Sequence, residues 1–151
     1  MDSTHGVENQ GIVHSENANK WFEKYLNKTG VKLIQHHPDL KYRPTRSKGR
    51  RSDDHKYLVA YQNKSSLHLV NENSVRDLNS RFKTDNHVNY KNFRPNVIID
   101  GPDAYDEDQW QYMSINGVQF LQLMNCDRCL ATQVNTTTGL QNQETLSALR
   151  K

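Results

Sequence analysis

Apolar side chains recur at helical spacing in three stretches of the chain. The first lies between Ser15, which can cap a helix N-terminus, and Gly30, which can end one. The side chains that share its apolar face are Ala18, Trp21, Phe22, Tyr25 and Leu26. This pattern predicts an amphipathic helix that begins after Ser15 and ends at Gly30.

Two further helices are expected later in the chain. Ser74 and Asp77 have the spacing of a capping box, and Val75, Leu78 and Phe82 follow on one face. This pattern predicts a helix that starts at Ser74. Residues 144–150 form a third, shorter helical pattern.

Short runs of apolar and alternating residues predict several strands. These runs are residues 31–35, 57–61, 67–70, 97–100, 112–115, 118–124 and 130–134. Asn116 and Gly117 separate two of the runs and are the pair preferred in type I′ hairpin turns. The runs at 97–100 and 118–124 are expected to be the central, best-buried strands. Their expected buried side chains are Val97, Ile98, Ile99, Phe120 and Leu123.

The remaining segments define the expected organisation. Residues 1–14 are polar and without periodicity, which predicts a tail or linker, and residues 15–151 are assigned to one domain. Residues 41–56 are basic and aperiodic and predict a long loop, and Thr138 and Gly139 predict a turn. Several strands with two or three helices indicate a β-rich α+β fold.

Composition adds three constraints. Hydrophobic residues make up 34% of the 151 positions, so the core is thin or completed by another domain. The net charge of +3 permits an anionic ligand without requiring one. The chain has neither an apolar run of about 18 residues nor a targeting signal, and two cysteines do not make a disulfide scaffold. A membrane segment is therefore not expected in this chain.

The cysteines stand in the motif Cys126-Asp127-Arg128-Cys129. A structural zinc site needs four ligands, and a thioredoxin-like pair needs a helix after the motif, whereas strand-like residues flank this one. Two packed thiols are the remaining structural interpretation. The cation Arg128 beside Cys129 instead favours a working thiolate.

Two other stretches carry candidate anion-binding groups. Arg94 and Asn96 flank Pro95 in NFRPN, directly before the apolar run at 97–100, where a guanidinium and an amide can hold an oxyanion. Ser80 and Arg81 end the stretch DLNSR on the second expected helix. Taken singly, each stretch is better explained without a ligand, the first by a surface salt bridge and the second by a solvated helix face.

Taken together, these motifs resemble the MOSC domain family in order and spacing. The resemblance covers about Ser15 to the last residue and is closest to amidoxime-reducing components and to the C-terminal domain of molybdenum cofactor sulfurase. The stretches that carry it are GVKLIQHHPD, DLNSR, NFRPNVIIDG, AYDEDQW, NCDRC and the TG pair at 138–139. It implies a MOSC-type mixed barrel with flanking helices, truncated at its C-terminal end.

The resemblance also implies roles for individual residues. Cys129 corresponds to the protein ligand of molybdenum and is the implied catalytic residue, whereas Cys126 corresponds to a cysteine that does not bind the metal. The residues implied to contact the molybdenum cofactor are Ser80, Arg81, Arg94, Asn96 and Arg128. Asp127 stands where the family usually has a small residue.

The implied function is that of a molybdenum-dependent oxidoreductase that reduces N-hydroxylated compounds such as amidoximes, with a cytochrome b5-type electron donor. Such proteins have an upstream β-barrel domain that this chain lacks, so the chain alone is expected to hold the cofactor poorly. A mitochondrial outer-membrane location is implied in this case.

Two alternatives remain open. A sulfurase C-terminal domain binds the same cofactor, is cytoplasmic, and would have a pyridoxal phosphate domain upstream. A nucleic-acid-binding module would instead use the basic run Lys41–Arg51, although the modest net charge argues against nucleic acid.

Overall fold

A computed structural model describes residues 2–4, 7–45, 57–62, 64–85 and 87–150. These residues form two compact units, one before residue 67 and one from residue 67 onward, and each is described by itself.

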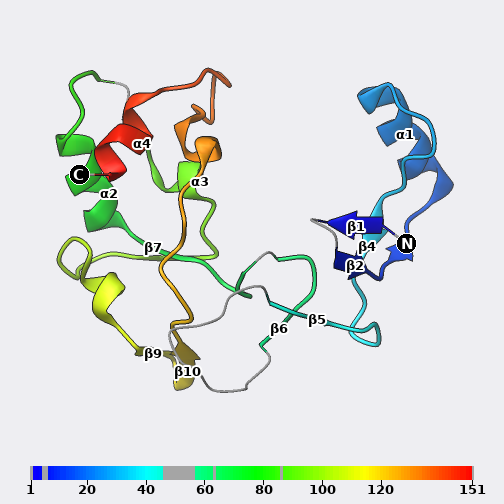
Figure 1. Ribbon diagram of the computed structural model, residues 1–151, viewed down its shortest axis with the longest axis horizontal. Coiled ribbons are helices and arrows are strands. Elements are labelled where there is room, and N and C mark those ends of the chain that lie inside the picture. Colours follow the sequence, from blue (N-terminus) through cyan, green and yellow to red (C-terminus); the bar gives the residue numbers. More distant parts are fainter. Residues whose placement is uncertain (1, 5–6, 46–56, 63, 86, 151) are drawn as a thin grey trace. The chain divides into compact units, whose positions relative to one another are not determined.

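The first unit contains three antiparallel strand pairs and one helix (Figure 1). Strand β1 pairs with β2, β3 with β4, and β5 with β6. The elements are β1 (Asp2–Thr4), β2 (Val7–Asn9), β3 (Ile12–Val13), α1 (Glu16–Leu26), β4 (Ile34–Gln35), β5 (Arg43–Pro44) and β6 (Leu58–Val59). Short strands thus occur in the first 14 residues, where the sequence shows no periodicity.

Helix α1 begins as its cap residue predicts and ends earlier than expected. The Ser15 hydroxyl accepts a hydrogen bond from the Ala18 N–H at 3.3 Å. The helix stops at Leu26 because Asn27 adopts a left-handed conformation with φ of 50°. Asparagine tolerates this conformation, so the predicted end at Gly30 is wrong by one helical turn.

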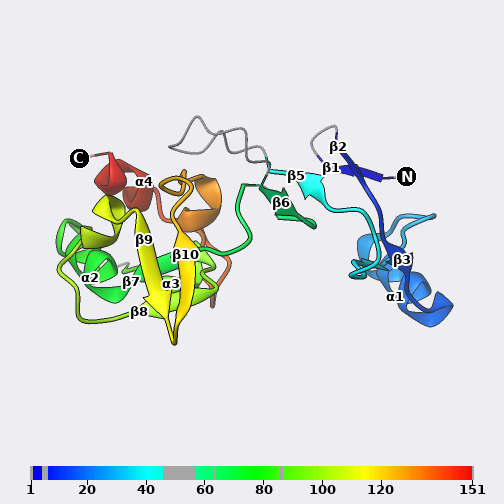
Figure 2. The same ribbon diagram turned by 90° about the horizontal axis from the view of Figure 1, so that it is seen from below.

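The second unit is built around a parallel strand pair joined through helices (Figure 2). Strand β7 leads directly into α2, and the chain returns through α3 to β8, which pairs with β7. The elements are β7 (Leu69–Asn71), α2 (Glu72–Ser80), α3 (Tyr90–Phe93), β8 (Val97–Ile99), η1 (Asp106–Gln109), β9 (Tyr112–Ile115), β10 (Val118–Leu121), η2 (Leu130–Gln133) and α4 (Glu144–Leu149). The two parallel strands place residues 68 and 96 at the same edge of the pair.

The hydrophobic core of this unit lies between β7, α2, α3 and α4. Its buried members are Val70, Val75, Leu78, Val88, Phe93 and Ala148. The expectation that residues 97–100 and 118–124 are the best-buried strands is wrong. Ile98 is 44% exposed and Phe120 and Leu123 are only half-buried, because within the described residues β8 and β10 each have a single neighbouring strand.

The hairpin of β9 and β10 is confirmed. Val118 lies opposite Ile115, and Asn116 and Gly117 both have positive φ, 48° and 80°. A type I′ turn requires positive φ at both of these positions, which asparagine and glycine adopt at little cost.

Two local expectations in this unit are corrected. The N-cap of α2 is Asn71 rather than Ser74, because the Asn71 side chain accepts from the Asn73 N–H at 3.0 Å. Ser74 lies inside the helix and is buried. Residues 130–133 form the 3-10 helix η2 rather than a strand.

The fold class is confirmed as mixed α and β. The described residues contain four α-helices instead of two or three, and their strands pair two by two, so they do not form the single mixed barrel.

The core assignment predicts a contrast between two apolar truncations in this unit. Leu78 is 2% exposed, so Leu78→Ala is expected to lower the free energy of unfolding by about 2–5 kcal/mol through a cavity. Ile98→Ala is expected to cost less than about 1.5 kcal/mol because that side chain is already half in water. Urea unfolding followed by Trp110 fluorescence in a Trp21→Phe background measures both, and equal losses would contradict this core.

Candidate functional site

The edge where β7 and β8 begin is fixed by hydrogen bonds between His68 and Asn96. The His68 N–H donates to Asn96 Oδ1 at 2.9 Å, and the Asn96 N–H donates back to the His68 carbonyl at 2.8 Å. The side chain and the backbone of Asn96 are therefore both held against β7. Asn96 itself is exposed, so its amide lies at the surface of this edge.

Arg94 reaches the same edge through an unusual backbone conformation. It ends α3 with φ of 54°, in the left-handed region that few residues other than glycine adopt, and its N–H donates to the Lys91 carbonyl at 3.2 Å. Pro95 then directs the chain into β8. The Arg94 side chain is exposed. A non-glycine residue in this conformation often marks a functional position.

Arg128 approaches this edge from a distant part of the chain. Its Nη1 lies 3.2 Å from His68 Nε2, and its guanidinium carbon lies 5.0 Å from the centre of the Phe93 ring. Burial lowers the pKa of His68, and the positive charge of Arg128 lowers this pKa further, against hydrogen bonds of the ring to the Phe93 and Arg94 backbone that raise it. His68 therefore favours its neutral form.

The backbone at Cys129 is held by η2 and α3. The Cys129 carbonyl accepts from the Thr132 N–H at 3.0 Å and from the Thr132 hydroxyl at 2.8 Å. The buried side chain of Asn92 donates to the Thr132 carbonyl at 3.3 Å and to the Val134 carbonyl at 2.8 Å. These contacts fix the segment while Cys129 stays exposed.

The structure thus gathers four of the six predicted site residues in one region. We call this region, made of His68, Arg94, Asn96, Arg128 and Cys129, the Cys129 site. Cys126 is also exposed, so the interpretation of two packed thiols is wrong for both cysteines.

Ser80 and Arg81 make their contacts elsewhere in the unit. The Arg81 guanidinium pairs with Asp77 and lies 5.1 Å from the centre of the Tyr105 ring. The Ser80 hydroxyl donates to the Asp77 carbonyl at 2.7 Å. That Ser80 and Arg81 contact the cofactor together with Arg94 stays a prediction.

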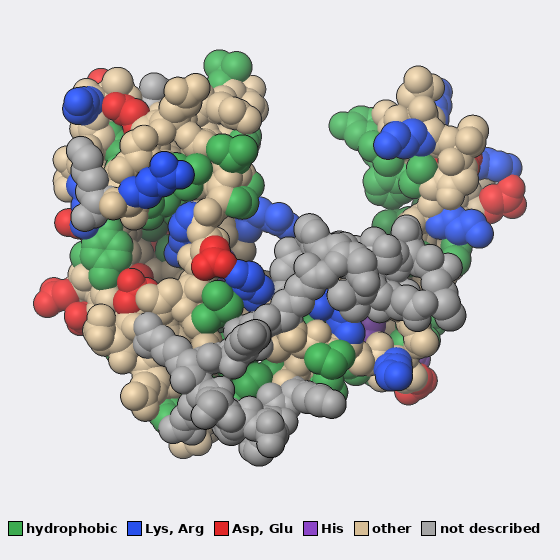
Figure 3. All heavy atoms as spheres, in the orientation of Figure 1, with side chains coloured by type: hydrophobic (Ala, Val, Ile, Leu, Met, Phe, Trp, Pro, Cys, Tyr) green, Lys and Arg blue, Asp and Glu red, His purple; other side chains and the backbone are tan. Residues whose placement is uncertain are grey.

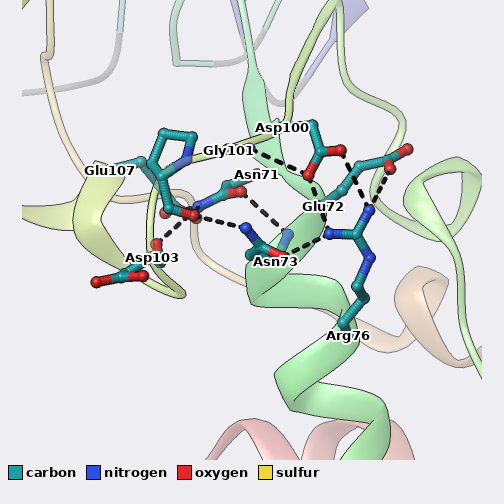
Figure 4. A network of polar contacts seen from close by, with 9 residues as sticks. Asn71, Glu72, Asn73, Arg76, Asp100, Gly101, Asp103 and Glu107 are labelled. Atoms are coloured by element: carbon teal, nitrogen blue, oxygen red, sulfur yellow. Dashed lines mark hydrogen bonds and ion pairs between the residues drawn. The ribbon is translucent and has the colours of Figure 1, made fainter.

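The opposite edge of the strand pair carries a polar network (Figure 4). The fully buried Asn71 donates to the Asp103 carbonyl at 2.9 Å and to Glu107 Oε2 at 3.1 Å. The Ser74 hydroxyl donates to Glu107 Oε1 at 2.6 Å. This network ties the segment after β8 to the start of α2.

An ion pair extends the network to the surface. Arg76 Nη1 lies 2.9 Å from Asp100 Oδ1, and Arg76 Nη2 lies 3.1 Å from Glu72 Oε2. Glu72 and Arg76 are one helical turn apart on α2, whereas Asp100 follows β8. The pair therefore holds the C-terminal end of β8 to the first turns of α2.

Sequence reasoning missed His68, Asn92 and Asn71. The sequence feature that could have indicated His68 is its position as the one polar residue in the apolar run 67–70. For Asn92 it is the position at the start of NFRPN. Asn71 carried no signal beyond being a good N-cap residue.

The described residues also bear on two alternatives, a metal site and nucleic-acid binding through the basic run. Among the described residues, histidine, cysteine and acidic side chains do not gather in threes to hold a metal ion. Most of the basic run 41–51 lies outside the described residues. Within it, Arg43 is buried and donates to the Gln62 carbonyl, so this arginine does not present its charge to nucleic acid.

Basic side chains are spread over the surface of the second unit. Figure 3 shows Lys and Arg side chains interspersed with apolar ones on the visible face of this unit. Within the part of the chain that the structure describes, none of the helices has the length and apolar character to cross a membrane.

Comparison with known proteins assigns the family. Residues 56–151 match the model of the MOSC domain, which covers more than half of the chain, and the chain therefore belongs to the MOSC domain family. This stretch contains all the residues of the Cys129 site.

Curated relatives support the same family. Mitochondrial amidoxime-reducing component 1 of Mus musculus is 35% identical over 152 residues, which cover 97% of this chain and 43% of the relative. Mitochondrial amidoxime reducing component 2 of Rattus norvegicus is 32% identical over 148 residues, covering 96% of this chain and 43% of the relative. Mitochondrial amidoxime-reducing component 1 of Homo sapiens is 32% identical over 154 residues, covering 97% of this chain and 44% of the relative. The chain thus spans less than half the length of these relatives.

The environment of Tyr105 beside Arg81 predicts a pH effect. Burial raises the pKa of Tyr105 from 10.0 to about 12, and Asp77 acts in the same direction while the Arg81 charge opposes it. A raised pKa means that the folded state favours the neutral phenol. The resulting stability is complete below pH 10 and is lost as pH rises through about 12.

The measurement compares the wild type with Tyr105→Phe. The free energy of unfolding is expected to fall less steeply across that alkaline range in the variant. The difference in phenolate absorbance between the wild type and the variant should titrate near the raised pKa. An ordinary tyrosine titration for this difference would contradict the assignment.

Proposed function

We propose that the chain binds a molybdenum cofactor through the Cys129 thiolate, as part of an oxidoreductase that reduces N-hydroxylated compounds. The observation that supports this most strongly is the Cys129 site itself, where an exposed thiol follows Arg128 in a segment held by Asn92 of α3 and by His68, the residue before β7. Family membership and the relatives named for amidoxime reduction support the same proposal.

The chemistry of the donor set fits such a cofactor. A thiolate is a soft ligand of the kind that binds soft transition metals. The phosphate of the cofactor is an anion, and Arg94, Arg128 and Asn96 offer two cations and an amide donor in the same region. In this proposal Cys129 ligates the metal, while the two arginines and Asn96 bind and orient the anionic part.

Ser80 and Arg81 are proposed as a second cofactor-contacting segment. Both lie at the C-terminal end of α2, and the Ser80 side chain is exposed. Arg81 is paired with Asp77, so part of its charge is already balanced. We therefore expect its contribution to cofactor binding to be smaller than that of Arg94.

The proposed reaction removes one oxygen atom from the substrate. An amidoxime takes up two electrons and two protons, its N–O bond breaks, and an amidine and water are formed. When bound, the cofactor would supply a two-electron centre able to accept that oxygen atom. The protein residues bind and orient the cofactor, and a cytochrome b5-type protein is the proposed electron donor.

The remaining parts of the proposal concern the longer relatives. Because this chain spans less than half of their length, we propose that further contacts to the cofactor come from an upstream β-barrel domain. The strand pairs of the second unit would then be parts of a mixed MOSC barrel. A mitochondrial location is proposed from the names of the relatives.

The proposal predicts different roles for the two cysteines. Cys129→Ser is expected to lose most of its molybdenum because oxygen replaces the soft sulfur donor, whereas Cys126→Ser should keep the wild-type content. The measurement is molybdenum per protein after expression in a host that makes the cofactor. Cys126→Ser is the matched control, since both thiols are exposed in the same motif. Equal contents in the two variants, or loss only in Cys126→Ser, would reject the assignment.

The proposal also predicts a specific role for Arg94. Arg94→Met removes a charged hydrogen-bond donor and should weaken cofactor binding by about 1.5–3 kcal/mol. Arg150→Met is the control, because Arg150 is an exposed arginine at the end of α4. Cofactor loss during dilution would be followed by fluorescence of the released pterin. Identical release rates in the two variants would remove Arg94 from the site.

A further inference from the structure

We propose that His68 is a positioning residue that fixes the guanidinium of Arg128, the residue before Cys129, while leaving its positive charge free to act on an anionic ligand. This inference rests on the proposed function for its ligand, a phosphate-bearing cofactor at Cys129. It concerns a residue that the resemblance to the MOSC family did not bring into the site.

The contact between the two side chains defines which atom carries the proton. Arginine has five N–H donors and lacks an acceptor, so Arg128 Nη1 must donate across the 3.2 Å to His68 Nε2. His68 Nε2 therefore carries a lone pair, and the ring proton sits on Nδ1. The lowered pKa of His68, caused first by burial and then by Arg128, agrees with a neutral ring.

A neutral partner has a different effect from a carboxylate. Arg81 in the same unit pairs with Asp77, so its charge is balanced within the protein. His68 accepts a hydrogen bond from Arg128 without adding a negative charge. Arg128 is thus immobilised and still carries its full positive charge.

Two further contacts complete the support around Arg128. The Phe93 ring lies 5.0 Å from its guanidinium carbon, which favours a fixed orientation of the cation over the ring. The His68 backbone exchanges hydrogen bonds with Asn96 at 2.9 and 2.8 Å. His68 therefore links two residues of the Cys129 site, Asn96 through its backbone and Arg128 through its ring.

The first test needs only the protein without cofactor. Nitrogen NMR of the histidine rings in the whole chain should show His68 as the neutral tautomer with its proton on Nδ1 at neutral pH. Assignment uses His68→Gln, whose spectrum lacks that ring. A charged ring, or a proton on Nε2, would overturn the proposal.

The second test measures the charge that Cys129 experiences. In a Cys126→Ser background, the quantity measured is the alkylation rate of Cys129 with anionic iodoacetate divided by its rate with neutral iodoacetamide. Gln keeps a neutral acceptor, so His68→Gln should leave the ratio within about twofold. His68→Glu adds a balancing charge and should lower the ratio about threefold or more, given an interaction within roughly one Debye length.

Controls separate positioning from folding. His87→Gln changes an exposed histidine in the same unit and should leave the ratio unchanged. Circular dichroism confirms that each variant is folded before its rates are compared. An unchanged ratio in folded His68→Glu, or an equal fall in His68→Gln, would overturn the role of His68.

Molybdenum content then relates the inference to the proposed function. His68→Gln should retain more cofactor than His68→Leu, which lacks an acceptor for Arg128, and equal losses in the two would contradict positioning. If the wild type binds no cofactor but the tautomer and the alkylation ratio are as expected, the proposed function fails and the role of His68 stands. If the wild type binds cofactor and the alkylation ratio does not change in His68→Glu, the role of His68 is wrong while the proposed function stands.

Discussion

The parallel pairing of β7 with β8 is the constraint on which the second unit depends. Parallel strands need a crossover connection, and α2 and α3 supply it between Asn71 and Val97. Polar contacts hold the pair at both edges. His68 and Asn96 lock the edge where the strands begin, and the buried Asn71 with Glu107 locks the edge where they end.

This pairing explains why residues distant in the sequence form one site. Arg94 ends α3 three residues before β8, and His68 directly precedes β7, so the parallel register brings them to the same edge. The segment that contains Arg128 and Cys129 is then attached to this edge by Asn92 and His68. The edge thus carries basic and amide groups, and the exposed Cys129 follows Arg128 in the attached segment.

Features set by neighbouring residues could be predicted from the sequence. Ser15 caps α1, Asn116 and Gly117 turn the hairpin, and residues 144–149 form α4, because each depends on local backbone preferences. The burial of Ile98 could not be predicted, since an apolar run does not reveal whether a second strand or helix covers it. For the same reason the helical turn at 130–133 was missed, because its contact with Asn92 depends on tertiary packing. The motifs indicated the Cys129 site, but the 60-residue separation of His68 and Arg128 left their contact without a sequence signal.

We propose above all that a thiolate of this chain, Cys129, is a ligand of the metal. X-ray absorption at the molybdenum edge of the loaded protein tests this claim most directly, because it counts the sulfur atoms around the metal. We expect one sulfur beyond those of the cofactor dithiolene, from Cys129. A coordination sphere that contains only the dithiolene sulfurs and oxygen would contradict it.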